Sequence, residues 1–343
     1  MATSAEAGAE GGAGAGPMAD DWLPVVDLAD ARTADGRARA VSQIRRACED
    51  GGFFLLVGHG IAEGLVHGVR AATAELFGGP ERNDPELAAD PADPLLRGLV
   101  AGNIEPLEAF TVNSLGEPGA FAQLPDDVRP SLGLPNKWPR ISGFAESYRS
   151  YMAATRELAD AIMRLFAMAL DLPEDWFAPH FKPDMSSLTV NFYPSSDARS
   201  GPDGKFLKIA HRDWGTLTIL YLDEGATGLQ VLGRDQVWRE VPVIPGAFVI
   251  NVGDLMALWT DNRWRSAVHR VVSPSTDRQA RDRLSVAYFH QPSPAALIAC
   301  VPGGGDPESG PQHRPQRADA YFESKRRQAY ITERLMKSTG RTS

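Results

Sequence analysis

Eight short segments between residues 187 and 290 limit most strongly what this chain can fold into. They are rich in Val, Ile, Thr and aromatic residues, and Gly, Pro, Asp or Asn separates them. In chain order they read "SLTVNFYP", "FLKIAHRD", "TLTILYL", "GLQVLG", "VWREVPV", "AFVINVG", "SAVHRVV" and "RLSVAYFHQP". Short strands at this spacing are typical of an all-β barrel or sandwich.

The flanking sequence predicts a different organisation. Residues 1–19 are Ala/Gly-rich and of low complexity, which predicts a disordered leader because such a segment buries too little apolar surface to offset its chain entropy. A single domain is expected over residues 20–343. Its expected parts are a mostly helical stretch (20–186), the β core (187–300) and a closing helix (317–338). Residues 78–138, rich in Pro, Asp and Gly, predict irregular structure.

Composition excludes several classes of function. The net charge of −9 disfavours binding to nucleic acid, because phosphate backbones repel an acidic surface. No apolar run approaches the ~20 residues of a membrane span, and no secretory signal is evident. The two cysteines, Cys48 and Cys300, have no metal-binding spacing and predict buried thiols. A cytoplasmic protein, monomeric or weakly homo-oligomeric, is expected.

The stretch "HRDWGTL" contains a candidate metal site. If it lies in a strand, His211 and Asp213 point to the same side, and His269 could reach the same centre from another strand. Two imidazoles and one carboxylate leave half of an octahedral ion's positions open, which is the pattern of non-haem Fe(II) oxygenases. The motif alone is weak evidence. An ordinary strand with a charged edge remains open at this point, as does a zinc site.

Two further polar pairs lie in apolar strands. Arg283 and Ser285 are two residues apart, as are Asn191 and Tyr193. A guanidinium fork beside a hydroxyl is suited to holding a carboxylate. Polar side chains that face a barrel interior need partners, and a metal with a bound dicarboxylate would satisfy all of them. Taken alone, the arginine and serine fit a salt-bridged surface strand equally well.

The ordered set of motifs resembles the isopenicillin N synthase-like subgroup of Fe(II)/2-oxoglutarate-dependent oxygenases. The matching segments are "GFFLLVGHGI", "VNFYP", "HRDWGTLTIL", "FVINVGDLMALWTDNRWRSAVHRV" and "RLSVAYFHQP". The likeness runs from about residue 22 to 335 and is best between 188 and 292. One departure is Gly58, where the family usually has Asn; the following His59 is kept and is expected to have a structural role.

The resemblance implies a mainly β protein with flanking helices around a double-stranded β-helix (jelly-roll) core. It implies an enzyme that uses Fe(II), 2-oxoglutarate and O2 to hydroxylate, desaturate or ring-close a small molecule. Related halogenases lack the carboxylate ligand, so its presence here favours these outcomes over halogenation. The implied iron ligands are His211, Asp213 and His269, and the implied 2-oxoglutarate residues are Arg283, Ser285, Tyr193 and Asn191.

Two alternatives stay open. An oxidase of the isopenicillin N synthase type uses no 2-oxoglutarate and holds its substrate's carboxylate with the same Arg/Ser pair. A degenerate, non-catalytic relative is the second. The region from Arg97 to Thr111 matches the family poorly, and the resemblance implies that substrate contacts come largely from such loops. The Ala/Gly-rich leader favours a role in secondary metabolism, such as antibiotic biosynthesis.

Overall fold

The computed structural model describes residues 22–101, 107–194, 206–223, 226–272, 282–305 and 308–339 of the 343. The predicted leader, residues 1–19, lies outside these ranges. No helix within them combines the length and the apolar character that a membrane crossing requires.

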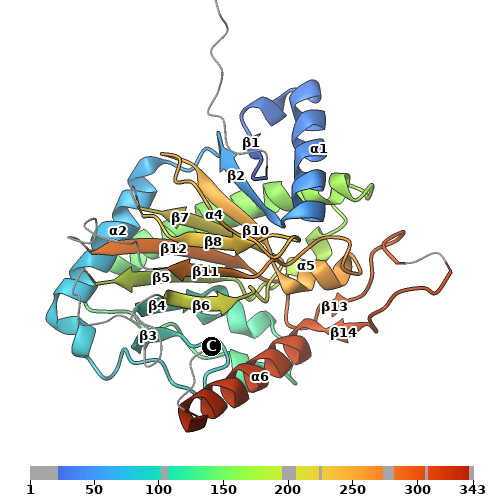
Figure 1. The fold of residues 1–343 in the computed structure, drawn as a ribbon. Coiled ribbons are helices and arrows are strands. Elements are labelled where there is room, and N and C mark those ends of the chain that lie inside the picture. Colours follow the sequence, from blue (N-terminus) through green and yellow to red (C-terminus); the bar gives the residue numbers. More distant parts are fainter. Residues whose placement is uncertain are drawn as a thin grey trace, which may run out of the picture.

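The larger of two facing sheets has eight strands (Figure 1). β1 pairs in parallel with β2, and every other neighbouring pair is antiparallel. In spatial order the strands are β1 (Val25–Asp27), β2 (Phe53–Val57), β10 (Phe248–Val252), β7 (Leu217–Leu222), β12 (Arg283–His290), β5 (Ser187–Tyr193), β4 (Glu108–Asn113) and β3 (Gly98–Ala101).

The second sheet has the order β6 (Phe206–His211), β11 (His269–Val272), β8 (Leu229–Leu232) and β9 (Trp238–Glu240). Side chains from β8 and β11 pack with Phe53, Leu55 and Val249 of the larger sheet, so the two sheets enclose one apolar layer. All eight segments predicted between residues 187 and 290 therefore form strands, β5 to β12, and the jelly-roll core is confirmed. A small ribbon follows, made of β13 (Leu297–Ile298) and β14 (Gln316–Arg317).

Helices cover the other face of the larger sheet. Strand β2 alternates between the two layers, because Phe54 and Leu56 join the helical core while their neighbours face the second sheet. The Thr33 hydroxyl accepts a hydrogen bond from Gly36 N and caps the first helix. The helices are α1 (Ala34–Asp50), α2 (Glu63–Gly78), α3 (Arg129–Leu132), α4 (Phe144–Ala169), α5 (Asp254–Trp259) and α6 (Ala318–Thr339).

Five short 3-10 helices complete the described elements. They are η1 (Asp30–Arg32), η2 (Pro80–Asn83), η3 (Ser114–Gly116), η4 (Ala120–Gln123) and η5 (Ala178–Phe181).

Two sequence-based expectations about the flanking regions were wrong in part. Within residues 78–138, β3 and β4 extend the larger sheet, and all six residues of β4 are buried. The reason is tertiary: Phe110 of β4 packs edge-on against Phe144 and Tyr148 of α4, a contact that local composition does not encode.

Of the two thiols, both expected to be buried, Cys48 is buried in α1, whereas Cys300 follows β13 and is partly exposed.

Candidate metal centre

Neighbouring strands bring the two candidate histidines together. His211 is the last residue of β6, His269 is the first of β11, and the two are direct partners in the antiparallel pairing. Their ring centroids are 4.3 Å apart. The predicted convergence of the two imidazoles from separate strands is therefore present in the structure.

Asp213 reaches the same place by a different route from the one predicted. Strand β6 ends at His211, so Asp213 lies in the loop before β7 and not in a strand. The loop backbone bonds to the start of α5: Asp254 N donates to Asp213 O at 2.8 Å, and Leu255 N to Gly215 O at 3.0 Å. The expected strand alternation was thus wrong, although the carboxylate still faces the imidazoles.

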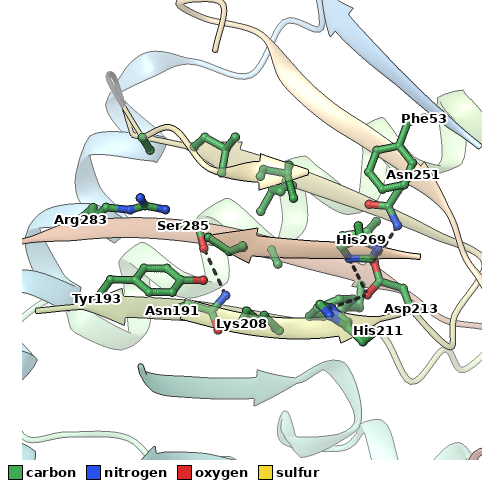
Figure 2. Close-up of a pocket in the computed structure, with 18 residues that line it drawn as sticks. Phe53, Asn191, Tyr193, Lys208, His211, Asp213, Asn251, His269, Arg283 and Ser285 are labelled. Carbon is green, nitrogen blue, oxygen red and sulfur yellow. Dashed lines mark hydrogen bonds and ion pairs between the residues drawn. The ribbon is translucent and has the colours of Figure 1, made fainter. Parts of the chain in front are cut away.

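The three candidate ligand atoms point toward one another (Figure 2). Asp213 Oδ1 lies 3.8 Å from His211 Nε2 and 3.7 Å from His269 Nε2. These separations are too long for hydrogen bonds. All three atoms lie within 4.8 Å of one another, as the ligands of a single ion must.

Hydrogen bonds to the opposite atoms prepare each side chain for this role. His211 Nδ1 lies 2.8 Å from Ile209 O, and His269 Nδ1 lies 3.2 Å from Ala267 O. An imidazole that donates from Nδ1 to a carbonyl keeps its lone pair on Nε2, as metal-binding histidines do. The backbone carbonyls therefore select the ligand-competent tautomer of both rings.

The carboxylate is oriented in the same way. Asp213 Oδ2 accepts hydrogen bonds from Thr218 Oγ1 at 2.5 Å and from Asn251 Nδ2 at 2.7 Å, which leaves Oδ1 for a metal. Sequence reasoning missed both of these supporting residues. Asn251 lies in the matched "NVGD" segment, but nothing in the sequence alone tied its amide to the carboxylate.

Electrostatics favour the metal-binding protonation states. Burial lowers the pKa of His211 to about 3, and the neighbouring His269 adds to this effect. Burial by itself raises the pKa of Asp213, but the two imidazoles and its two hydrogen bonds outweigh this and lower it. At neutral pH His211 is therefore uncharged and Asp213 ionised, so a cation meets no competing proton on either side chain.

The other predicted residues lie at the far end of the same pocket (Figure 2). Arg283 pairs across the sheet with Tyr193, and Ser285 with Asn191. The guanidinium carbon lies 5.0 Å from the centroid of the Tyr193 ring, and Asn191 Nδ2 donates to Ser285 Oγ at 3.2 Å. Both predicted pairs of alternate residues therefore share one strand face, as the spacing indicated.

Arg283 is a half-buried cation without an ion pair in the described part of the chain. Its Nη1 donates to Thr227 O at 2.9 Å, while its Nε is buried and has no hydrogen-bond partner there. Burial lowers the pKa of Arg283, and Tyr193 and Asp223 offset this in part. A buried charge without a counter-ion is costly, so this end of the pocket is suited to an anion.

The carboxyl-terminal helix α6 is attached to the metal-ligand loop. Asp254 Oδ2 accepts hydrogen bonds from Tyr321 Oη at 3.0 Å and from Lys325 Nζ at 2.6 Å, both on α6. The same Asp254 donates its backbone N–H to Asp213 O. One residue thus joins the loop that carries the carboxylate to the last helix of the fold.

Two histidines of the chain serve other purposes. His59 Nε2 lies 2.8 Å from Gly246 O and its Nδ1 accepts from Ile61 N, which agrees with the expected structural role. His290 is buried, stacked on Phe181, and does not line the pocket of the metal centre. Neither contributes a donor to the candidate centre.

The fold and the site define a class of non-haem metal enzyme, and comparison with known proteins identifies it. A family model for the 2OG-Fe(II) oxygenase superfamily matches residues 185–292, and one for the non-haem dioxygenase N-terminal region, described from morphine synthesis, matches residues 23–141.

Curated relatives match over most of their length. Validamycin A dioxygenase of Streptomyces hygroscopicus subsp. limoneus is 33% identical over 296 residues, 82% of this chain and 81% of the relative. A 2-oxoglutarate-Fe(II) type oxidoreductase of Emericella nidulans is 30% identical over 330 residues, 91% of this chain and 92% of the relative. Among solved structures, a full-length Neurospora crassa protein in complex with alpha-KG and thymine superposes with a TM-score of 0.80 at 22% identity, covering 91% of this chain and 99% of that one.

The chain belongs to the 2OG-Fe(II) oxygenase superfamily. It is a non-haem iron, 2-oxoglutarate-dependent dioxygenase that acts on a small molecule and uses Fe(II), 2-oxoglutarate and O2. The alternative of a 2-oxoglutarate-independent oxidase is not favoured by these relatives.

Proposed function

We propose that His211, Asp213 and His269 are the iron ligands, and that Arg283 binds the distal carboxylate of 2-oxoglutarate. Ser285, Tyr193 and Asn191 assist the arginine. The observation that carries this assignment is one pocket with complementary ends. Three metal-ligand atoms without hydrogen bonds converge at one end, and a half-buried guanidinium with no ion pair among the described residues lies at the other (Figure 2).

The donor set fits Fe(II). Two neutral imidazoles and one carboxylate leave several positions of an octahedral ion for other ligands. When bound, Fe(II) with 2-oxoglutarate and O2 supplies the oxidising chemistry, and 2-oxoglutarate becomes succinate and CO2. The task of the protein is to position the reactants and exclude water. Thr218 and Asn251 orient the carboxylate ligand, and Arg283 fixes the far end of the co-substrate.

The pocket wall between the two ends is mainly apolar. Leu220, Leu229, Val271 and Ala287 line it together with the polar residues. An apolar wall excludes water and strengthens the attraction between the guanidinium and a carboxylate. Lys208 adds a further positive charge to the lining, and cationic groups together with a metal favour a molecule that carries acid groups.

We further infer that the prime substrate is a small molecule of secondary metabolism and that the chain takes part in antibiotic biosynthesis. A relative that is 33% identical is a validamycin A dioxygenase, which supports this assignment. The net charge of −9 argues against a nucleic-acid substrate.

We also propose that the protein is a cytoplasmic monomer or weak homo-oligomer that does not bind membranes. The supply of 2-oxoglutarate inside cells and the two free cysteines support the cytoplasmic location.

Anaerobic titration tests the ligand assignment. We expect the parent protein to bind one Fe(II), to develop a charge-transfer absorption band on addition of 2-oxoglutarate, and to release succinate once O2 is admitted. His211→Ala should lose iron binding and the band. His67→Ala, which removes an exposed histidine of α2, is the matched control and should behave as the parent. Iron binding by His211→Ala at parental affinity would show that the triad is assigned wrongly.

A further inference from the structure

A second cavity, of about 410 Å³, is lined by residues of α5, of α6 and of the loop that carries Asp213. Its lining includes Arg212, Asp254, Arg265, Ser266, Tyr321 and Lys325. None of these residues lines the pocket of the metal centre. The cavity is therefore separate from the co-substrate pocket, although Arg212 lies between two of the proposed iron ligands in the sequence.

Positive charge in this cavity exceeds negative charge. The lining contains three cations, Arg212, Arg265 and Lys325, against one acid, Asp254, which is already engaged by Lys325 and Tyr321. The excess does not follow from a shortage of acids, because the chain has 44 Asp and Glu against 35 Lys and Arg. Some exposed arginines elsewhere pair with acids, as Arg327 does with Glu323, whereas Arg46 has no ion pair within the described ranges. The feature that distinguishes this cavity is that two arginines without ion pairs line it together, and such a pair is suited to an anion.

Both arginines have N–H groups that make no hydrogen bond within the described ranges. Arg212 is exposed and makes no hydrogen bond or ion pair within the described ranges. Arg265 donates from Nη2 to Leu232 O at 2.9 Å, while its Nη1 is buried and has no partner among the same residues. Burial lowers the pKa of Arg265, and the charges of Arg234 and Arg212 add to this. A bound anion would relieve the repulsion between these like charges.

The remaining lining is mixed, because polar side chains alternate there with Ala257, Leu258 and Trp264. Ser266 is 4% exposed, and its hydroxyl has no hydrogen-bond partner in the described part of the chain. Asn262, Gln316 and Ser324 also line the cavity. One water molecule occupies about 30 Å³ in the liquid, so a cavity of about 410 Å³ has room for an anion and an attached polar body.

We propose that this cavity binds a phosphate group, with Arg212 and Arg265 as cationic donors and Ser266 as a hydroxyl donor. The excess of two positive charges matches the charge of about −1.5 to −2 that a phosphate monoester carries at neutral pH. The phosphate can be free or carried by a small hydroxylated metabolite. The site goes beyond the proposed function and does not depend on the iron assignment.

Calorimetric titration with inorganic phosphate and with glucose 6-phosphate tests the site. The parent should bind in the millimolar range or tighter. Arg212→Met should bind roughly tenfold or more weakly, because each charge-assisted hydrogen bond lost typically has that effect. Arg140→Met, which removes an exposed arginine outside the cavity, is the matched control and should bind as the parent.

Ser266→Ala separates a binding role from a structural one. Replacing a buried, unpartnered hydroxyl by hydrogen should leave the melting temperature unchanged or raise it, while phosphate affinity falls. Phosphate affinity should be the same with and without saturating 2-oxoglutarate, which occupies the other pocket, so that failure of the co-substrate assignment and failure of this site are distinguishable. Tighter binding of glucose 6-phosphate than of phosphate supports a carried phosphate, and equal binding supports the free anion. Parental affinity in both Arg212→Met and Ser266→Ala, or no binding of either probe by the parent, would overturn the proposal.

Discussion

Replacing Arg283 by Met is the most informative perturbation of the co-substrate pocket. One guanidinium nitrogen, Nη1, is committed to Thr227 O, so Nε and Nη2 remain for a ligand. Two adjacent N–H groups match the two oxygens of a carboxylate. A hydrogen bond to a charged group contributes about 1.5–3 kcal/mol, so losing two costs roughly 3–6 kcal/mol. That corresponds to a loss in 2-oxoglutarate affinity of roughly 10²- to 10⁴-fold.

Anaerobic titration of the iron-loaded protein measures this effect through the charge-transfer band. 2-Oxobutyrate has the same 2-oxo acid end but no distal carboxylate, and it provides the internal control. Its affinity should change little in Arg283→Met, so the preference of the parent for 2-oxoglutarate should disappear. Iron binding should also be unaffected, because Arg283 lies at the other end of the pocket. If Arg283→Met bound 2-oxoglutarate within a few-fold of the parent, the anchoring argument would be wrong.

Three further predictions concern the metal centre and stability. His269→Ala should bind Co²⁺, a stand-in for Fe(II), at least tenfold more weakly by calorimetry, and parental affinity would exclude His269 as a ligand. Thr218→Val removes one of the two bonds to Asp213 Oδ2 and should weaken Co²⁺ binding by roughly 10- to 100-fold, whereas no change would mean that Asn251 alone orients the carboxylate. Burial lowers the pKa of His290 to about 3, so between about pH 6.5 and 3 the unfolded chain binds a proton at this residue and the folded chain does not. On acidification through this range, the free energy of unfolding, measured with urea, should fall less for His290→Gln than for the parent, by up to about 1.4 kcal/mol per pH unit. The same dependence of unfolding free energy on pH in both proteins would contradict this.

The strands of the core were predictable because each carries its own signal. Segments of β-branched and aromatic residues between turn residues gave β5 to β12, and alternation correctly put Arg283 and Ser285 on one face. The loop position of Asp213 was not predictable, because it depends on hydrogen bonds to α5, more than 40 residues later in the chain. Strand β4 was missed for the same reason, since packing against α4 and pairing with β5 define it more than its own composition does.

The same distinction applies within the site. The candidate donor atoms could be proposed from residue type and spacing, because imidazole and carboxylate groups suit Fe(II), and guanidinium and hydroxyl groups suit a carboxylate. Their supporting contacts could not be predicted. Thr218 and Asn251 come from two different strands of the larger sheet, β7 and β10, and meet at one carboxylate oxygen. Ordinary residues acquire such roles only through the tertiary arrangement.

The bonds from Asp254 to Tyr321 and Lys325 have a consequence for the order in which the enzyme matures. During synthesis the strands and the ligand loop leave the ribosome before α6 does, so for a time the loop lacks the two side chains that secure its neighbour. Helix α6 therefore secures the residue that holds the loop of Asp213 in place. A nascent or shortened chain that ends before α6 should hold iron loosely even though all three proposed ligands are present.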